Sequence, residues 1–141
     1  MCVSAFGESQ TRYRLYLKLE EMVQDLLRQT IVCDVMVNGS FVTECINPDD
    51  IDVATHISSD FSELLSSSQK NLLNQLADGT YAMGLDSFVE VEYPRDHPEH
   101  ADWRVEKSWG EQWGIEHSKQ WCKGVVVLRL WETNVGLRIR R

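Results

Sequence analysis

Residues 35–53 read Val-Met-Val-Asn-Gly-Ser-Phe-Val-Thr-Glu-Cys-Ile-Asn-Pro-Asp-Asp-Ile-Asp-Val, and this stretch decides the fold of the chain. The short, β-branched run 31–37 predicts a buried strand. It ends in the Asn-Gly-Ser sequence of residues 38–40, where a glycine permits a sharp turn or the close approach of a ligand to the backbone. After the Asn-Pro-Asp turn of residues 47–49, a second short strand is predicted over 50–57.

Two acidic residues open this second strand. Because side chains alternate between the faces of a strand, Asp50 and Asp52 are expected on one face, about 7 Å apart, while Ile51 and Val53 point into the core. Two like charges held this close repel each other, and a buried strand seldom begins with such a pair unless a cation lies between them. The pair therefore predicts a cation site.

Outside this stretch, two helical patterns are clear. Over residues 9–30 the apolar side chains recur at three- and four-residue steps, which predicts an amphipathic helix with Ser9 or Thr11 as its N-cap. A second helical stripe is predicted to begin at residues 58–60 and to end before residues 78–79. This connection is long enough to cross over the sheet.

The remaining segments complete a small mixed sheet. Residues 87–93 alternate in polarity and predict a strand, and residues 124–131 are the most strand-like run of all. Between them, residues 96–121 hold four of the five tryptophans, and a helix is expected around 99–113. We therefore predict an α/β (α+β) fold, a small mixed sheet flanked by helices, as one domain over 1–141.

Composition excludes several classes of protein. The 141 residues suffice for one domain, and no apolar run approaches the roughly 20 residues that cross a bilayer. The chain opens without a secretory signal, so a cytoplasmic location and four unpaired cysteines are expected. A formal charge of −8 argues against binding duplex DNA, although a small anion accompanied by a metal remains compatible with it.

Ordering the segments on the sheet brings the polar residues together. Gly39 and Ser40 end the first strand, Ser40 heads a short helical turn, and Asp50 and Asp52 begin the second strand at the same edge. Asp86 opens the third strand and is expected nearby as a third carboxylate. Three carboxylates beside a Gly-Ser turn would suit magnesium and a triphosphate, because magnesium prefers carboxylate, phosphate and water oxygens.

These residues resemble a known signature. Gly39-Ser40 followed by Asp50-Ile51-Asp52 is similar to the Gly-Ser…Asp-x-Asp motif of the polymerase-beta-like nucleotidyltransferase superfamily. With the later blocks Gly-Leu-Asp-Ser-Phe-Val at 84–89 and Lys-Gly-Val-Val-Val-Leu-Arg-Leu at 123–130, the chain resembles a family of small bacterial and phage nucleotidyltransferase-like proteins. The resemblance covers roughly residues 10 to 131.

The resemblance implies a role for each matched residue. Gly39 and Ser40 would contact the β- and γ-phosphates of a nucleoside triphosphate. Asp50, Asp52 and Asp86 would be the catalytic carboxylates and would hold Mg²⁺ or Mn²⁺. The chain departs from the wider superfamily in two respects. It has no second domain or large basic patch to position an acceptor, and Ser40 is followed by the apolar Phe41, where many active transferases carry a polar or basic residue.

Each candidate also has a purely structural interpretation. The Gly-Ser sequence is compatible with an ordinary turn, and Asp50 with the turn chemistry of the Asn-Pro-Asp-Asp loop. Glu90 and Glu92 share the strand face of Asp86 and are alternatives to it. The acidic and histidine residues of 96–100 superficially offer metal ligands, but Pro98 breaks any helical spacing, so an exposed loop is expected there. Three basic residues near the end of the chain are candidates to reach phosphates, with Lys123 as the expected phosphate ligand, although surface lysines usually have no specific role: Lys119, Lys123 and Arg129.

Two functions follow from the sequence. The first is a metal-dependent nucleotidyltransferase that moves a nucleotidyl group to an RNA, protein or small-molecule acceptor, in a toxin–antitoxin or phage-defence setting. The second is a non-catalytic member of the same fold that binds a nucleotide or a partner protein, as an antitoxin or interaction module. The presence of all three carboxylates favours the enzyme.

Overall fold

The computed structural model describes residues 4–100 and 125–130. The elements follow one another as helix, strand, short helical turn, strand, two helices, strand and strand, which confirms the predicted mixture of α and β structure. Their bounds are α1 Arg12–Arg28, β1 Asp34–Asn38, the 3₁₀ turn η1 Ser40–Val42, β2 Ile51–Ser58, α2 Ser59–Glu63, α3 Ser67–Ala77, β3 Leu85–Glu92 and β4 Val126–Arg129.

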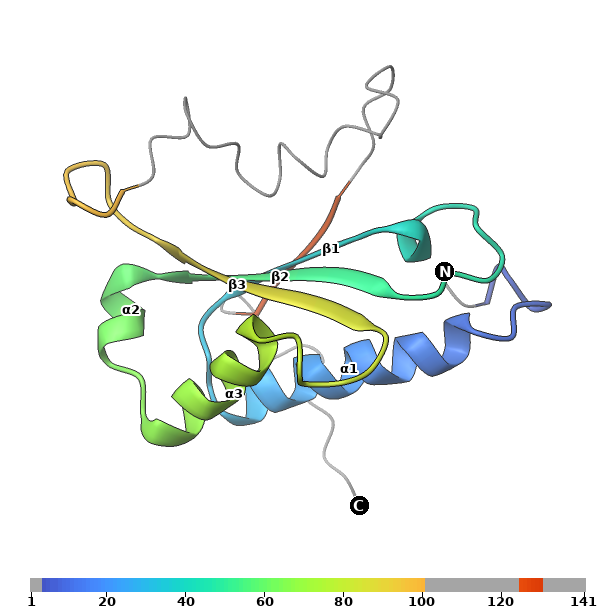
Figure 1. Cartoon of the computed structure of the whole chain (residues 1–141), viewed down its shortest axis with the longest axis horizontal. Helices are drawn as coiled ribbons and strands as arrows, with labels where there is room; N and C mark the ends of the chain where they lie inside the picture. Colours follow the sequence, from blue (N-terminus) through green and yellow to red (C-terminus); the bar gives the residue numbers. More distant parts are fainter. Residues whose placement is uncertain (1–3, 101–124, 131–141) are drawn as a thin grey trace.

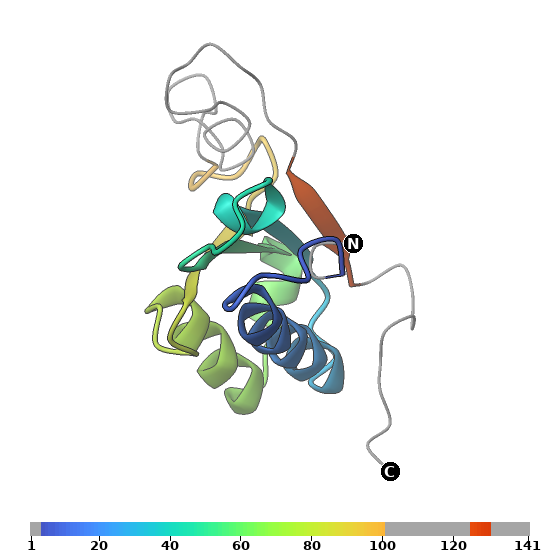
Figure 2. The ribbon, with the colours of Figure 1, turned by 90° about the vertical axis from the view of Figure 1, so that its right-hand side faces the viewer.

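The strands form one mixed sheet in the order β3-β2-β1-β4. Strand β1 runs antiparallel to both β2 and β4, whereas β2 and β3 are parallel and are joined through α2 and α3. Helices α1 and α3 lie against the same face of the sheet (Figures 1 and 2). The connection predicted to cross over the sheet does so, because parallel neighbours cannot be joined by a tight turn.

The core lies between this face of the sheet and the helices. Ile51 and Val53 are fully buried and contribute to it, as the alternation of β2 predicts. The other members come from the apolar stripes of both long helices, from β1, from η1 and from the rest of β2, and they include Leu15, Met22, Leu26, Val35, Val37, Phe41, Ile57, Leu72, Leu73 and Leu76. Asp52 and its neighbours at alternate positions therefore lie on the face opposite α1 and α3.

Helix α1 begins where the sequence predicts. Thr11 is the N-cap residue by position, but its side chain makes no capping hydrogen bond. The hydroxyl of Ser9 accepts hydrogen bonds from the backbone N–H groups of Arg12 (3.1 Å) and Thr11 (3.3 Å) instead. Both expected capping residues thus contribute, one by position and the other by its hydroxyl, which satisfies N–H groups that have no partner within the helix.

The second helical stripe is not continuous, contrary to the prediction. It is divided into α2 and α3, and Leu64 in the gap is 82% exposed. The break is local in origin. Ser66 forms a capping box with Gln69, whose side chain accepts from the Ser66 N–H at 2.8 Å while the Ser66 hydroxyl accepts from the Gln69 N–H at 3.3 Å. A new helix therefore starts at Ser67.

The strand boundaries also shift by a few residues. β1 begins at Asp34 rather than residue 31, and β3 begins at Leu85, two residues earlier than predicted. β4 occupies the middle of its predicted range. The helix expected around 99–113 and the tryptophan-rich segment lie outside the described residues, as does the end of the chain.

Within residues 4–100 and 125–130, no helix combines the length and apolar character that a membrane crossing would require.

Candidate functional site

The Gly39 turn and the Asp52 carboxylate are in direct contact. Asn38, the last residue of β1, pairs with Asp52 of β2, so the turn that follows β1 lies beside this aspartate. Gly39 has φ +82°, and a Cβ placed on it would lie 2.2 Å from the Oδ2 atom of Asp52. Glycine is required at position 39 for two reasons. A residue with a side chain is strained at this positive φ, and its Cβ would displace the Asp52 carboxylate.

Asp86 is the strand neighbour of the same aspartate. The parallel register of β2 and β3 pairs Asp52 with Asp86 directly, and the N–H of Ile51 donates to the carbonyl of Gly84 at 3.0 Å. Paired residues on neighbouring strands project from the same face of a sheet. The predicted order of turn, carboxylate and carboxylate along one edge of the sheet is therefore present in the fold.

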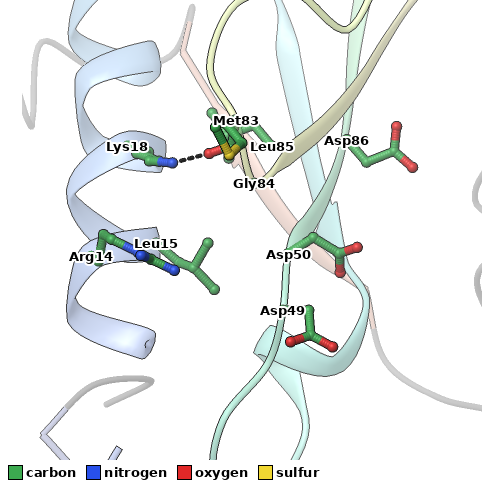
Figure 3. Close-up of a pocket in the computed structure, with 9 residues that line it drawn as sticks. All are labelled: Arg14, Leu15, Lys18, Asp49, Asp50, Met83, Gly84, Leu85 and Asp86. Carbon is green, nitrogen blue, oxygen red and sulfur yellow. Dashed lines mark hydrogen bonds between the residues drawn. The ribbon is translucent and has the colours of Figure 1, made fainter. Parts of the chain in front are cut away.

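Asp50 comes immediately before β2, and it is exposed, as is Asp86. Figure 3 shows the carboxylates of Asp50 and Asp86 turned to the same side, away from Arg14 and Lys18 on α1. Asp52 is more enclosed than either of them. The site thus consists of two exposed carboxylates, Asp50 and Asp86, at the beginnings of β2 and β3, and of the half-buried Asp52 carboxylate, which lies against the Gly39 turn.

A metal group is not preassembled in the part of the chain that the structure describes. No three His, Cys, Asp or Glu side chains there are grouped so that they could hold an ion. In kind, the donors suit a hard cation: Asp50, Asp52 and Asp86 supply only oxygen atoms. In placement, Asp52 and Asp86 are strand neighbours, and the Asp52 carboxylate lies against the Gly39 turn. The donors therefore suit magnesium or manganese in their chemistry, but in the described part of the chain they are not grouped as a metal site.

Asn38 is a further polar residue at this edge that the sequence pattern did not single out. Its side chain is 2% exposed, and its Oδ1 atom has no hydrogen-bond partner. A buried carbonyl oxygen without a donor is uncommon in folded proteins. The sequence could have indicated Asn38 only through its position, because it directly precedes Gly39 and lies on the strand face shared with Asp52.

Phe41 does not obstruct the turn. Its side chain is 3% exposed and belongs to the hydrophobic core, so it points away from the surface on which a phosphate would lie. The 3₁₀ turn that Ser40 was expected to begin is present. Its Thr43 hydroxyl donates to the Ser40 carbonyl at 2.8 Å, and the Thr43 N–H donates to the same oxygen at 3.2 Å. The departure from the superfamily pattern at Phe41 therefore concerns packing rather than the face that carries Asp52.

The strongest contact that sequence reasoning missed involves Arg12. This residue is fully buried, and its guanidinium donates to backbone carbonyls of the segment that follows Ser40. A second hydrogen bond joins the far end of the same segment to the residues that precede α1: Asn47 Oδ1 accepts from the backbone N–H of Gln10 at 2.9 Å. A charged residue in the first turn of an amphipathic helix gives no sequence signal of this kind, because such residues are mostly exposed.

A pocket of about 390 Å³ opens between α1 and the beginnings of β2 and β3 (Figure 3). The Lys18 ammonium donates to the Met83 carbonyl across it. Gly84 has φ +89°, and a Cβ there would approach Leu15 Cδ2 to 3.0 Å. Its lining residues are Arg14, Leu15, Lys18, Asp49, Asp50, Met83, Gly84, Leu85 and Asp86. The pocket therefore lies between α1 and the exposed carboxylates of Asp50 and Asp86.

The alternative acidic residues on β3 lie elsewhere. Glu90 pairs with His56, whose Nδ1 is 3.3 Å from Glu90 Oε2 and 3.9 Å from Glu92 Oε1. Four residues of strand separate Glu90 from Asp86, about 13 Å at the usual rise. Glu90 and Glu92 therefore do not substitute for Asp86.

The histidine loop forms a local turn. His97 stacks on Tyr93 with ring centroids 4.5 Å apart, and its Nδ1 accepts from the Glu99 N–H at 3.1 Å. His100 Nδ1 lies 2.7 Å from the Tyr93 carbonyl oxygen. These contacts accord with the expected exposed loop.

The basic candidates near the end of the chain are not brought to the site. Arg129 pairs with Asp34 at the opposite end of β1 from Gly39, so the fold does not place it beside the Gly39 turn. Lys119 and Lys123 lie outside the described residues.

Cys33 and Cys45 are both free thiols, as expected. Cys33 is buried, and burial, aided by the nearby Asp34 charge, raises its thiol pKa from 9.0 to about 12. Cys45 is exposed. The other two cysteines, Cys2 and Cys122, lie outside the described residues.

The chain belongs to a family of unknown function, DUF6932, whose model matches residues 1–129. No curated protein and no solved structure matches the chain.

Proposed function

We propose that this chain, a member of a family with no assigned activity, is a metal-dependent nucleotidyltransferase. The observation that carries the proposal is the contact between the Gly39 turn and the Asp52 carboxylate, with Asp86 as the next residue across the sheet. A glycine turn beside paired carboxylates suits a triphosphate with a divalent cation. An ordinary turn does not need a carboxylate held against its glycine.

The proposed roles follow the resemblance of the sequence to polymerase-beta-like nucleotidyltransferases. Gly39 and Ser40 would bind the β- and γ-phosphates through their backbone N–H groups and through the Ser40 hydroxyl. Asp50, Asp52 and Asp86 would hold magnesium or manganese. Asp86, which lies on the edge strand β3, would also orient the acceptor hydroxyl. Bound at these carboxylates, a divalent cation would neutralise phosphate charge and favour the attacking oxygen. Lys123 is proposed as a further phosphate ligand.

The acceptor is proposed to be an RNA end, a protein hydroxyl or a small molecule, in the cytoplasm and in a toxin–antitoxin or phage-defence setting. The net charge of −8 disfavours duplex DNA as the acceptor.

One observation favours a second candidate, a nucleotide-binding or protein-binding module without catalysis. The three carboxylates are not gathered into a metal group among the described residues. A module of this kind would use the same turn to bind a nucleotide or a partner protein and would transfer nothing.

The deciding experiment is to incubate the full chain with each nucleoside triphosphate, labelled at the α-phosphate, with Mg²⁺ or Mn²⁺ and total cell RNA, protein or small metabolites. Label transfer that is lost in Asp52→Asn, but kept in the control variant Asp96→Asn, would support the enzyme. Asp96 is a suitable control because it is exposed and lies in the loop after β3. Metal-dependent nucleotide binding without transfer would favour the module, and absence of both would refute the nucleotide site.

A further inference from the structure

The guanidinium of Arg12 is the internal anchor of the segment that follows the Gly-Ser turn. Its Nη1 donates to the Phe41 carbonyl at 2.6 Å, its Nη2 to the Thr43 carbonyl at 2.8 Å, and its Nε to the Cys45 carbonyl at 3.0 Å. Nη2 also donates to Cys45 and lies 3.5 Å from the Ser40 carbonyl. One side chain thus holds alternate carbonyls along residues 41–45.

The cation is also enclosed by aromatic rings. Its central carbon lies 3.8 Å from the ring centroid of Phe6 and 5.5 Å from that of Phe41. A guanidinium over an aromatic face is attracted by the ring, and the attraction is greatest where water is excluded. Arg12 has no exposed surface. Its interactions are therefore made inside the protein, where side-chain motion is restricted.

The segment has little secondary structure of its own to fix its path. Between η1 and β2 no helix or strand is present, and the backbone bonds within η1 are only those from Val42 to Gly39 (3.3 Å) and from Thr43 to Ser40 (3.2 Å). Inward-facing carbonyl groups need donors when they are buried. Arginine supplies five donors in a planar fork, which a lysine ammonium does not reproduce.

We infer that Arg12 is a positioning residue for the phosphate-binding turn. On one side, the pairing of Asn38 with Asp52 fixes the turn. On the other side, Arg12 fixes the carbonyls that begin immediately after Ser40, and it thereby sets where the Ser40 hydroxyl and backbone lie relative to the Asp52 carboxylate. The effect on nucleotide affinity rests on the proposed function. The effect on the conformation of the turn does not.

The test compares Arg12→Lys with Arg28→Lys in the full chain. Arg28 is a matched control because it lies in the same helix, at its exposed end, where it pairs with Asp25. Two quantities are measured at a temperature at which both variants are fully folded by circular dichroism: hydrogen exchange of the amides of residues 39–46, and the affinity for each nucleoside triphosphate with Mg²⁺.

Arg12→Lys is expected to speed exchange in residues 39–46 at least tenfold, to leave β2 and α3 as protected as in the wild type, and to weaken nucleotide binding at least tenfold. Arg28→Lys should change neither. A purely structural role in overall stability would instead speed exchange in all elements together. If Arg12→Lys does not fold, Phe6→Leu removes one enclosing ring and should give the same local pattern to a smaller degree.

The results separate the two proposals. Unchanged exchange in residues 39–46 of a folded Arg12→Lys variant, or of Phe6→Leu where that variant replaces it, would overturn the inference. So would faster local exchange with wild-type nucleotide affinity. If the wild type binds no nucleotide at all, the proposed function fails, and exchange in residues 39–46 alone decides whether Arg12 positions the turn.

Discussion

Gly39→Ala provides the sharpest test of the contact between the turn and Asp52. The substitution has two costs. Alanine at φ +82° and ψ −170°, a backbone conformation adopted almost only by glycine, is strained, which costs about 1–3 kcal/mol. The new Cβ would also lie 2.2 Å from Asp52 Oδ2, so the carboxylate must rotate away, at about 0.5–1.5 kcal/mol for a displaced rotamer.

Gly79→Ala is the control for a strained positive-φ backbone without a clash of the new side chain. Gly79 has φ +65°, but a Cβ there would meet nothing within 4 Å. Both variants should therefore lose stability through backbone strain, and Gly39→Ala should lose about 1 kcal/mol more because the Asp52 carboxylate is displaced. For a domain of this size, that difference corresponds to roughly 4 °C in Tm. The assay is chemical and thermal denaturation followed by circular dichroism.

The double variant Gly39→Ala with Asp52→Ala completes the cycle. Removing the carboxylate removes the clash, so Gly39→Ala should cost about 1 kcal/mol less in that background than in the wild type. Nucleotide binding should be lost in Gly39→Ala and retained in Gly79→Ala. The reasoning is refuted if the two glycine variants lose equal stability, or if deleting the Asp52 side chain leaves the cost of Gly39→Ala unchanged.

Three further predictions rest on separate features. Asp86→Asn should preserve nucleotide affinity in a calorimetric titration and lower the rate of label transfer by a factor of roughly 10² to 10⁴; an equal loss of affinity and rate would contradict its role toward the acceptor. In the native protein, a thiol reagent should modify Cys45 and spare Cys33 until the chain unfolds. Because burial raises the Cys33 pKa from 9.0 to about 12, the unfolded chain releases that proton first, and the free energy of unfolding should fall as the pH rises above 9; in Cys33→Ala the fall should be smaller. Ser66→Ala removes the hydroxyl half of the capping box with Gln69 and should cost about 1 kcal/mol in denaturant unfolding, a result contradicted by wild-type stability.

The sequence by itself determined those features that arise within a few neighbouring residues. The helix of residues 12–28 follows from its apolar period, and the alternation of Ile51, Asp52 and Val53 assigned the two apolar residues to the core and Asp52 to the opposite face. The need for glycine at position 39 was also visible, since only a turn or a close approach explains it. These signals depend on the spacing of residues along a single helix, strand or turn, and this spacing can be read from the sequence alone.

The break between α2 and α3 was local as well, but it was hidden by a competing signal. The leucine stripe suggested one helix, whereas the capping box at Ser66 began a new one, and the exposed Leu64 shows that the stripe was not a continuous buried face. Capping satisfies specific N–H groups, so it decided the boundary where hydrophobic spacing alone was ambiguous.

Only the tertiary structure decided which distant residues meet. The pairing of Asp52 with Asp86 requires the parallel register of β2 and β3, and the separation of Glu90 from the site follows from that same register. The burial of Arg12 against the carbonyls of Phe41, Thr43 and Cys45 joins residues about thirty positions apart, and no local pattern encodes it. The physical reason is that a strand register and a buried guanidinium are fixed by partners brought together through chain folding, whereas periodicity and capping are fixed by neighbours in sequence.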